Sequence, residues 1–335
     1  MTKHFIEYLL TAALAVMTAQ SCVSKIDPIF DESSANRVEA LAERLNETLT
    51  GAPNGWLLEY YPSSGQYYGG FNVFLSFSEG NKVKVGSEVA GKGKTATSTY
   101  SIYQSAGCVL TLDTYNEVMH YFADPETTGG QGAGFGFEGD FEFNVLDLQD
   151  EKITLKGRKT GSTMTMTPMP VSMSWDDYIV ALKEEESAIS KHTRIRYQTA
   201  DNKYDGRING RTLEIFSEVD GEQVTASYPF IFNLMGVTFY KPLELGDERI
   251  DGLVYNPDMA DGGAFIPVND GAEGYFVPTY PTITDYLMDK NWFFSYKGLS
   301  DYGKKLWDKA AESLKAAGDN ITYCYLGNIP VDREV

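Results

Sequence analysis

Histidine is scarce in this chain of 335 residues, which holds only His4, His120 and His192. Histidines this far apart exclude the HExxH motif of zinc proteases and a histidine-rich metal site. The sequence also lacks a GxSxG nucleophile elbow, and neither His120 nor His192 lies within a recognisable nucleophile motif. We therefore predict no catalytic residue, no metal site and no bound cofactor.

Basic residues are few as well. The chain has 28 Lys+Arg against 47 Asp+Glu, which gives a formal net charge of −19 at pH 7. A surface this acidic repels phosphate backbones, because binding to nucleic acid depends on neutralising phosphates with Lys and Arg. Nucleic acid is therefore excluded as a partner.

Cysteine is equally rare, with Cys22, Cys108 and Cys324 as its only members. Cys108 and Cys324 lie in runs typical of β-strands, where a free cysteine behaves as a small hydrophobic residue. One disulfide between the two halves of the chain is the alternative in an oxidising compartment. Because both residues lie in strand-like runs, we favour free thiols at Cys108 and Cys324 over a disulfide.

Aromatic residues and glycine are abundant by contrast. Aromatics make up 13% of the chain, hydrophobic residues 42%, and there are 32 glycines. This composition is typical of a folded, β-rich protein rather than a disordered one. The length exceeds what a single hydrophobic core usually organises, about 250–300 residues, so we expect two domains.

The N-terminus has the features of a targeting segment. Tyr8 to Ala19 is apolar but too short to span a bilayer stably. It ends in Ala19-Gln20-Ser21-Cys22, which resembles a bacterial lipobox. We predict that residues 1–21 are a lipoprotein signal peptide, that Cys22 is lipidated, and that residues 22–33 form a tether. The alternative is an ordinary thiol after an ordinary signal peptide.

Residues 34–170 form the first predicted domain. Apolar residues recur at helical spacing from Ser34 to Leu49, and short alternating segments follow up to Pro170, among them Glu117 to Phe122. A helix followed by eight or nine short strands predicts an antiparallel lipocalin-like barrel or a curved meander. The fold class is thus α+β and predominantly β.

Residues 171–335 form the second predicted domain, also α+β. It opens with a helix from Trp175 to Ile189, capped by Ser174, and continues with short strands. Asn256 to Gly274 is rich in Gly and Asp and is predicted to be an exposed loop. A short helix near Thr284 to Asp289 and a longer one from Ser300 to Ala317 follow, the latter with Leu306, Trp307, Ala310, Ala311 and Leu314 on a buried face.

Gly134 to Gly139 spells GxGxxG, the fingerprint of dinucleotide-binding folds. That fingerprint needs a strand before it and a helix after it, so that the helix N-terminus faces the pyrophosphate. Here the alternating segment Phe141 to Leu148 follows, which is typical of a strand. We interpret the glycines as a loop and exclude a dinucleotide site.

Exposed aromatic side chains are the remaining candidates for ligand contact, because Tyr and Trp rings stack on sugars and anchor interfaces. Tyr67 and Tyr68 lie in a Gly/Ser-rich turn, where side chains are poorly buried. Trp292 and Tyr296 lie near loops late in the chain. These four residues are the predicted ligand-binding candidates.

Several segments resemble a known family. These are the Cys22 lipobox, Ala52 to Tyr61 (APNGWLLEYY), Gly139 to Phe143 (GDFEF), and the strand that runs from Lys156-Gly157-Arg158 to Met169-Pro170. With them the chain, from about residue 20 to 330, is similar to an uncharacterised lipoprotein family of Bacteroidota, a domain of unknown function. Members of such families often lie beside SusC/SusD-type uptake systems. Cys22 is the only functional residue that the resemblance assigns in this sequence.

The resemblance implies a lipid-anchored protein of the outer membrane, on the cell surface or the periplasmic face, that assists nutrient uptake. We expect a non-enzymatic accessory that binds a glycan, a peptide or a partner protein, with SusC/SusD-type proteins among the expected partners. Tethering a ligand at the membrane would raise its effective concentration at a transporter. The alternative is a carboxylate-dependent envelope hydrolase acting on glycans, which needs two acids close in space. A purely structural component is a third reading.

Replacing the predicted lipidation residue tests the anchor directly. We expect Cys22→Ala to move the protein from the membrane fraction to the soluble fraction, because the acyl chains are its expected attachment. Cys108→Ala, at an internal cysteine, serves as the matched control and should leave the protein with the membranes. Fractionation followed by immunoblotting measures both, and a Cys22→Ala protein that stays with the membranes would refute the anchor.

Overall fold

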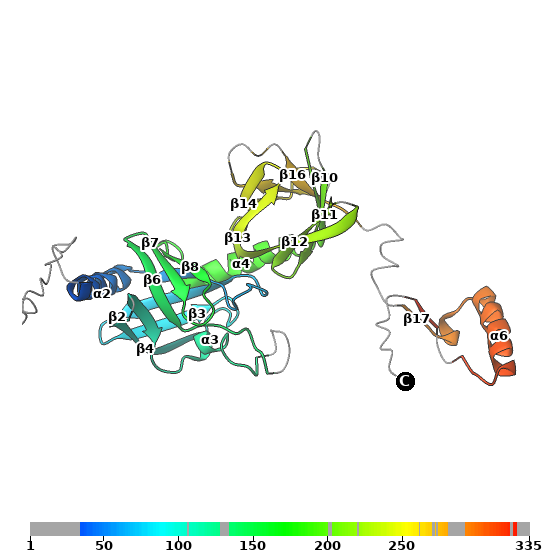
Figure 1. Ribbon diagram of the computed structural model, residues 1–335, viewed down its shortest axis with the longest axis horizontal. Coiled ribbons are helices and arrows are strands. Elements are labelled where there is room, and N and C mark those ends of the chain that lie inside the picture. The colour runs from blue at the N-terminus through cyan, green and yellow to red at the C-terminus, as the bar shows by residue number, and fades with distance from the viewer. Residues whose placement is uncertain are drawn as a thin grey trace, which may run out of the picture.

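The structure is a computed structural model that describes residues 34–326, apart from 106, 128–133, 200–202, 220, 261, 270–271, 273, 281–291 and 322–323. The predicted signal peptide, Cys22 and the tether lie outside the described residues. Two closed antiparallel barrels of eight strands each form the body of the protein (Figure 1). The predicted fold class, predominantly β with an N-terminal helix and an antiparallel barrel, is confirmed.

The first barrel is an up-and-down meander in which each strand pairs with the next along the chain. Pairing of the first strand with the last, for example Trp56 with Pro168, closes the sheet and removes its edges. Inward-facing residues are buried and alternate with more exposed ones, as in Ile153 and Leu155. The strands are β1 (Trp56–Tyr60), β2 (Phe71–Ser78), β3 (Lys82–Ser87), β4 (Thr95–Gln104), β5 (Cys108–Leu112), β6 (Glu142–Gln149), β7 (Lys152–Gly157) and β8 (Thr163–Pro168).

Helix α2 (Ser34–Gly51) packs on the first barrel and confirms the helix predicted for this segment. Leu45 and Leu49, from the apolar stripe seen in the sequence, are fully buried. The indole N–H of Trp56 donates a hydrogen bond to the carbonyl oxygen of Leu49 at 3.0 Å. This bond satisfies a carbonyl of the last helical turn, which has no partner within the helix.

One predicted strand of the first half is wrong. Within the segment Glu117 to Phe122, residues Glu117–His120 form a short helix, α3. The side chain of Asn116 accepts hydrogen bonds from the backbone N–H groups of Val118 and Met119, which caps the turn. Val118 and Met119 are both buried although they are adjacent, so the inward–outward alternation of a strand is broken.

The predicted α+β second half also contains a closed barrel, which the sequence pattern did not indicate. Helix α4 (Trp175–Ile189) precedes it, and the Oγ of Ser174 accepts from the backbone N–H of Asp177 as the predicted cap. The last strand pairs back with the first to close the sheet. The strands are β9 (Arg194–Gln198), β10 (Lys203–Asn209), β11 (Thr212–Val219), β12 (Glu222–Asn233), β13 (Gly236–Leu245), β14 (Glu248–Asn256), β15 (Ala264–Pro267) and β16 (Tyr275–Pro278).

The predicted exposed loop from Asn256 to Gly274 is partly wrong, because β15 lies inside it. Ala264 and Phe265 are buried, and Phe265 pairs with Phe276 of β16. A four-residue strand flanked by Gly and Asp is too short to stand out by periodicity. Closure of the barrel decides its conformation, since without it β14 and β16 would be left with open edges.

A buried ion pair joins the two barrels. Arg211, which precedes β11, donates to both carboxylate oxygens of Glu88 at 2.9 and 3.0 Å. The side chain of Glu88 is 0% exposed and that of Arg211 is 11% exposed. Arg211 also donates to Glu186 of α4 at 3.1 Å and to the carbonyl oxygen of Gly70. Its guanidinium therefore contacts both barrels and the helix between them.

Asn72 on β2 extends this joint. Its backbone N–H donates to Glu88 at 2.7 Å, and its side-chain amide donates to the carbonyl oxygen of Phe232 in the second barrel at 2.9 Å. The hydroxyl of Tyr178 on α4 donates to the amide oxygen of Asn72 at 3.3 Å. Polar groups buried between the barrels are thus satisfied by partners from three elements, which fixes their relative positions.

The C-terminal segment contains β17 (Trp292–Phe294), a 3₁₀ turn η1 (Tyr296–Gly298), α6 (Asp301–Ala316) and β18 (Cys324–Leu326). The predicted buried face of α6 is wrong for the part of the chain that is described. Leu306 is 53% exposed, Leu314 is also exposed, and Trp307 is half-buried against the ring of Tyr296. Amphipathic spacing predicts which face is apolar but not what covers it. The predicted helix at Thr284 to Asp289 lies outside the described residues.

Removing one partner of the buried pair tests the joint. We expect Arg211→Met to lower the free energy of unfolding by about 3–5 kcal/mol, because Glu88 would keep a buried charge without its counter-ion. Arg249→Met removes an arginine that is 70% exposed and pairs with Asp251, and such surface pairs contribute about 0–1 kcal/mol. Denaturant unfolding measures both. Similar losses in the two variants would contradict a special role for the buried pair.

Candidate functional site

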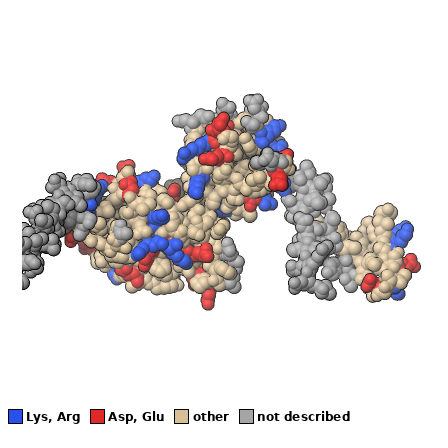
Figure 2. Space-filling model, viewed as in Figure 1, with Lys and Arg blue, Asp and Glu red and all other residues tan. Residues whose placement is uncertain are grey.

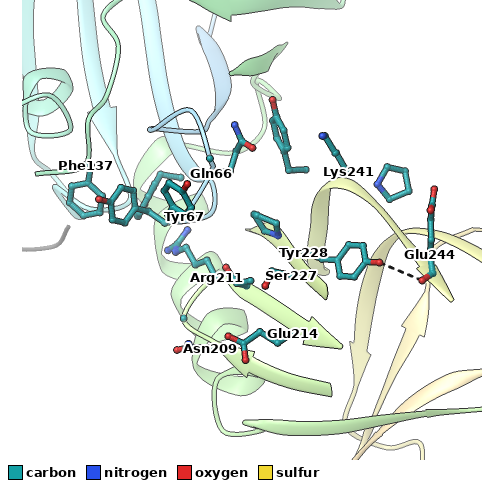
Figure 3. A pocket seen from close by; sticks show the side chains of 18 residues that line it. Gln66, Tyr67, Phe137, Asn209, Arg211, Glu214, Ser227, Tyr228, Lys241 and Glu244 are labelled. Carbon is teal, nitrogen blue, oxygen red and sulfur yellow. Dashed lines mark hydrogen bonds between the residues drawn. The ribbon is translucent and has the colours of Figure 1, made fainter. Parts of the chain in front are cut away.

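A cleft of about 1050 Å³ opens where the two barrels meet, and we call it the inter-barrel cleft (Figure 3). One side comes from the turn between β1 and β2 in the first barrel, with Phe137 behind it. The other comes from the turn between β10 and β11 and from residues of β11, β12 and β13. The lining residues are Gly65, Gln66, Tyr67, Tyr68, Phe71, Phe137, Asn209, Gly210, Arg211, Thr212, Glu214, Ser227, Tyr228, Pro229, Tyr240, Lys241, Pro242 and Glu244.

The first-barrel turn is held by local hydrogen bonds. Ser63 and Gln66 both adopt positive φ, at 64° and 52°, a conformation that non-glycine residues rarely take. The Gln66 amide donates to the carbonyl oxygen of Ser64 and to the hydroxyl of Ser162, which in turn donates to the carbonyl oxygen of Ser63. These bonds fix the strained turn against β8 and set the direction in which Tyr67 points.

The same turn is also attached to the second barrel. The backbone N–H of Gly70 donates to the carbonyl oxygen of Phe230 at 3.0 Å. Gly69 has a φ of +67°, and a Cβ placed on it would lie 2.3 Å from the Cβ of Arg211. Only glycine fits where these two segments of the backbone approach so closely. The turn that carries Tyr67 therefore belongs to the joint as well as to the cleft.

The structure brings two of the four predicted ligand-binding residues into this cleft. Tyr67 is 66% exposed and available to a ligand. Tyr68 is half-buried, donates to the carbonyl oxygen of Gly136 at 3.2 Å and packs edge-on against Phe137. Tyr68 thus also shapes the wall on which Tyr67 sits.

Trp292 and Tyr296 do not line this cleft; they belong to β17 and η1 of the C-terminal segment. The hydroxyl of Tyr296 donates to Asp308 at 3.2 Å, and its ring packs against Trp307. These contacts give Tyr296 a local packing role next to α6.

The loop from Gly134 to Gly139 has a structural role in the cleft. Strand β6 follows it rather than a helix, in agreement with its interpretation as a loop. Its Gly136 accepts from Tyr68, and its Phe137 packs against Tyr68 and Phe71. The glycine-rich loop therefore positions the ring of Phe137 in the cleft wall.

Sequence reasoning missed the residues that the second barrel contributes. Tyr228 and Pro229 on β12 and Tyr240 and Pro242 on β13 also line the cleft (Figure 3 labels Tyr228). The ring of Tyr240 packs 4.7 Å from that of Tyr61, and its hydroxyl accepts from the backbone N–H of Thr163 at 3.0 Å. The aromatic residues on β12 and β13 were visible in the sequence, but their meeting with a turn about 160 residues earlier was not.

Charges of both signs line the cleft. Arg211 and Lys241 contribute the positive charge, and Glu214 and Glu244 the negative charge. Glu214 accepts from Arg207 at 2.7 Å, whereas Glu244 is exposed at the rim. Among the described residues, no three His, Cys, Asp or Glu side chains come close enough to hold a metal ion. The cleft is therefore suited to hydrogen bonding and ring stacking.

The two internal histidines contact protein side chains outside the cleft. The ring of His120 stacks on Phe141 at 4.7 Å and bonds with Asn116. His192 forms a 2.8 Å hydrogen bond with the hydroxyl of Tyr255 and packs edge-on against Phe265. Burial lowers the pKa of His192, with Lys191 adding to the effect. In the structure, Cys108 is a buried free thiol and Cys324 an exposed one.

Residues 26–257 match the model of a family described as a domain of unknown function, DUF4302. The chain belongs to this family. The DUF4302 match covers the first barrel, the joint and the second barrel up to β14, and so includes every residue that lines the cleft. No curated protein matches the chain. No helix in the described part of the chain combines the length and the apolarity that a membrane crossing requires.

The stability of the region around Glu59, a residue of β1 two positions before Tyr61, is expected to depend on pH. Burial raises the pKa of its carboxyl, and Lys152 opposes part of that shift. A group whose pKa is higher in the folded than in the unfolded protein stabilises the fold at pH values below its unfolded pKa. This contribution is lost as the pH rises through the folded pKa. We therefore expect Glu59→Gln to become more stable than the parent protein as the pH rises from 4 to 7.

Thermal melts across that pH range measure the difference between the two proteins. The exposed Glu79 provides the control, because Glu79→Gln should track the parent protein at every pH. A Glu59→Gln protein that loses stability relative to the parent at pH 7 would show instead that the carboxylate is favourably paired there.

Proposed function

We propose that this protein is a lipid-anchored accessory of the bacterial cell envelope that binds a glycan in its inter-barrel cleft without chemically changing it. The single observation that carries this proposal is the composition of the cleft. Three tyrosines line this one hollow, the 66% exposed Tyr67 from the first barrel and Tyr228 and Tyr240 from the second, together with amide and charged side chains. The lipidation of Cys22 and the outer-membrane location rest on the sequence.

The cleft suits a sugar ring for physical reasons. Sugars present apolar C–H faces and hydroxyl edges, and Tyr rings offer a flat apolar face with a polar tip. Asn209 provides an amide that both donates and accepts, and Gln66, whose N–H groups are taken by Ser64 and Ser162, provides an amide oxygen that accepts. Because two joined barrels hold the walls, little entropy is lost in ordering the site on binding.

The anchor would turn modest affinity into useful capture. Lipidated Cys22, followed by a tether of residues 22–33, would hold the barrels close to the membrane. A ligand retained there reaches a neighbouring transporter at a raised effective concentration. SusC/SusD-type uptake proteins are the partners we propose, on the resemblance of this chain to lipoproteins found beside them.

The cleft favours binding over hydrolysis. A glycosidase places two carboxyl groups on either side of the scissile bond, one of them kept protonated by its surroundings. In the cleft Glu214 accepts from Arg207, and Glu244 is exposed to solvent. Of the two acids that line the cleft, one is therefore engaged by a guanidinium and the other is exposed, whereas hydrolysis needs a working pair of carboxyl groups.

Truncating the exposed ring tests the proposal. We expect Tyr67→Ala to weaken glycan binding roughly tenfold, because an aromatic anchor at the centre of a site typically contributes more than about 1 kcal/mol. Tyr115→Ala is the matched control, since Tyr115 is 72% exposed on the same barrel but does not line the cleft. Glycan-array screening of the mature protein in detergent, followed by calorimetry, measures both variants.

Three results would overturn the proposal. Binding that is equally weakened by Tyr115→Ala would place the ligand elsewhere. Cleavage of the bound glycan by the purified protein would make it a hydrolase. Capture of peptides by the cleft, with no glycan bound, would change the ligand class.

A further inference from the structure

Helix α6 of the C-terminal segment presents a row of apolar side chains to solvent. At about 3.6 residues per turn, residues four apart lie on one face of a helix. Tyr302, Leu306, Ala310 and Leu314 form such a row, which we call the α6 stripe. Tyr302 is 72% exposed, Leu306 is 53% exposed, and Ala310 and Leu314 are exposed as well. An exposed apolar row of this kind marks a docking surface.

The charged residues of α6 follow a regular order around the rest of the helix. Its three acidic residues form a row opposite the α6 stripe, and its four lysines lie in pairs between that row and the two edges of the stripe. The acidic residues are Asp301, Asp308 and Glu312, and the lysine pairs are Lys305 with Lys309 and Lys304 with Lys315. Side chains of both signs are visible on the segment that carries α6 (Figure 2).

This order of charges suits a lipid surface. A lysine at the edge of an apolar face lays its carbon chain along the hydrocarbon and keeps its ammonium group among the headgroups, whereas the shorter acidic side chains cannot reach back in this way. A helix that lies in the membrane interface therefore carries lysines at the edges of its apolar face and acids farthest from the lipid. A protein partner would require charges at particular points of contact, not along both edges of the stripe.

Aromatic residues beside the stripe point to the same surroundings. Trp307 lies next to the α6 stripe and is half-buried against the ring of Tyr296, which is 43% exposed. Trp and Tyr favour the boundary between headgroups and acyl chains, because their rings are apolar and carry one polar group. The four lysines and three acids give α6 one net positive charge, on a chain whose formal charge is −19. Anionic headgroups therefore repel α6 less than they repel the rest of the chain.

We propose that α6 lies in the plane of a membrane surface, with the α6 stripe among the acyl chains and the acidic row in water. The helix lies beyond residue 257, where the family match ends, and does not line the inter-barrel cleft, so this contact goes beyond the proposed function. Together with an anchor at Cys22, it would hold the chain to the membrane at both ends. An interfacial helix by itself attaches reversibly, so release of the Cys22→Ala protein on fractionation is still expected.

Sedimentation with vesicles of phosphatidylcholine tests this contact. The mature chain carries Cys22→Ala, so that no acyl chain contributes to binding. We expect Leu306→Glu to weaken vesicle binding roughly tenfold, because it puts a carboxylate where an apolar side chain would enter the hydrocarbon. Glutamate is a good helix former, so α6 should persist in this variant. Leu146→Glu is the matched control, since Leu146 is 56% exposed on β6, and it should leave binding unchanged.

A charge exchange tests the order of the charged residues separately. Lys309→Glu combined with Glu312→Lys keeps the composition and net charge of α6 but brings an acid to the edge of the stripe. We expect this double variant to bind the vesicles several-fold more weakly than the parent protein. Binding that is unchanged by the exchange would overturn the proposed orientation of the helix.

Other results would overturn the membrane contact itself. One is the absence of vesicle binding, and another is an equal loss of binding in Leu306→Glu and Leu146→Glu. Light scattering on the lipid-free protein tests the other occupant of the stripe. A dimer that Leu306→Glu dissociates would show that a second copy of the chain covers the α6 stripe in place of lipid.

Discussion

The ion pair between Arg211 and Glu88 is the interaction on which the arrangement of this protein depends. A carboxylate with no exposed surface requires a counter-ion and hydrogen-bond donors, and both barrels supply them. Arg211 also lies over the rings of Phe71 and Phe232, one from each barrel. Because one guanidinium satisfies groups from both domains, the barrels are held in one relative position and the cleft between them keeps its shape.

That constraint also shapes the cleft. Arg211 lines the cleft, and the turn that presents Tyr67 is attached to the second barrel through Gly69 and Gly70. A residue that secures the joint is therefore also part of the cleft wall. A cleft built in this way is preorganised for the ligand we propose, since its walls are already ordered in the folded protein.

The sequence predicted local features well and non-local ones poorly. Helical spacing before Trp56 and alternation after it were sufficient for α2 and for the first barrel, because these patterns repeat over short distances. The short helix at Glu117–His120 and the strand β15 were missed, since each is four residues long and is decided by a cap or by barrel closure. The exposure of Tyr67 was predictable because turns bury side chains poorly, whereas Tyr228 and Tyr240 reach the cleft only through tertiary packing.

The amino-acid sequence by itself determined the β-rich character of the chain, its acidic charge and its poverty in histidine. It also carries the lipobox-like segment that predicts an anchor at Cys22. Only the tertiary structure decided that the second half closes into a barrel, that a buried ion pair joins the two barrels, and that a cleft opens where they meet. The physical reason is that composition and periodicity act within a few residues, whereas closure, burial and charge pairing join residues more than a hundred positions apart.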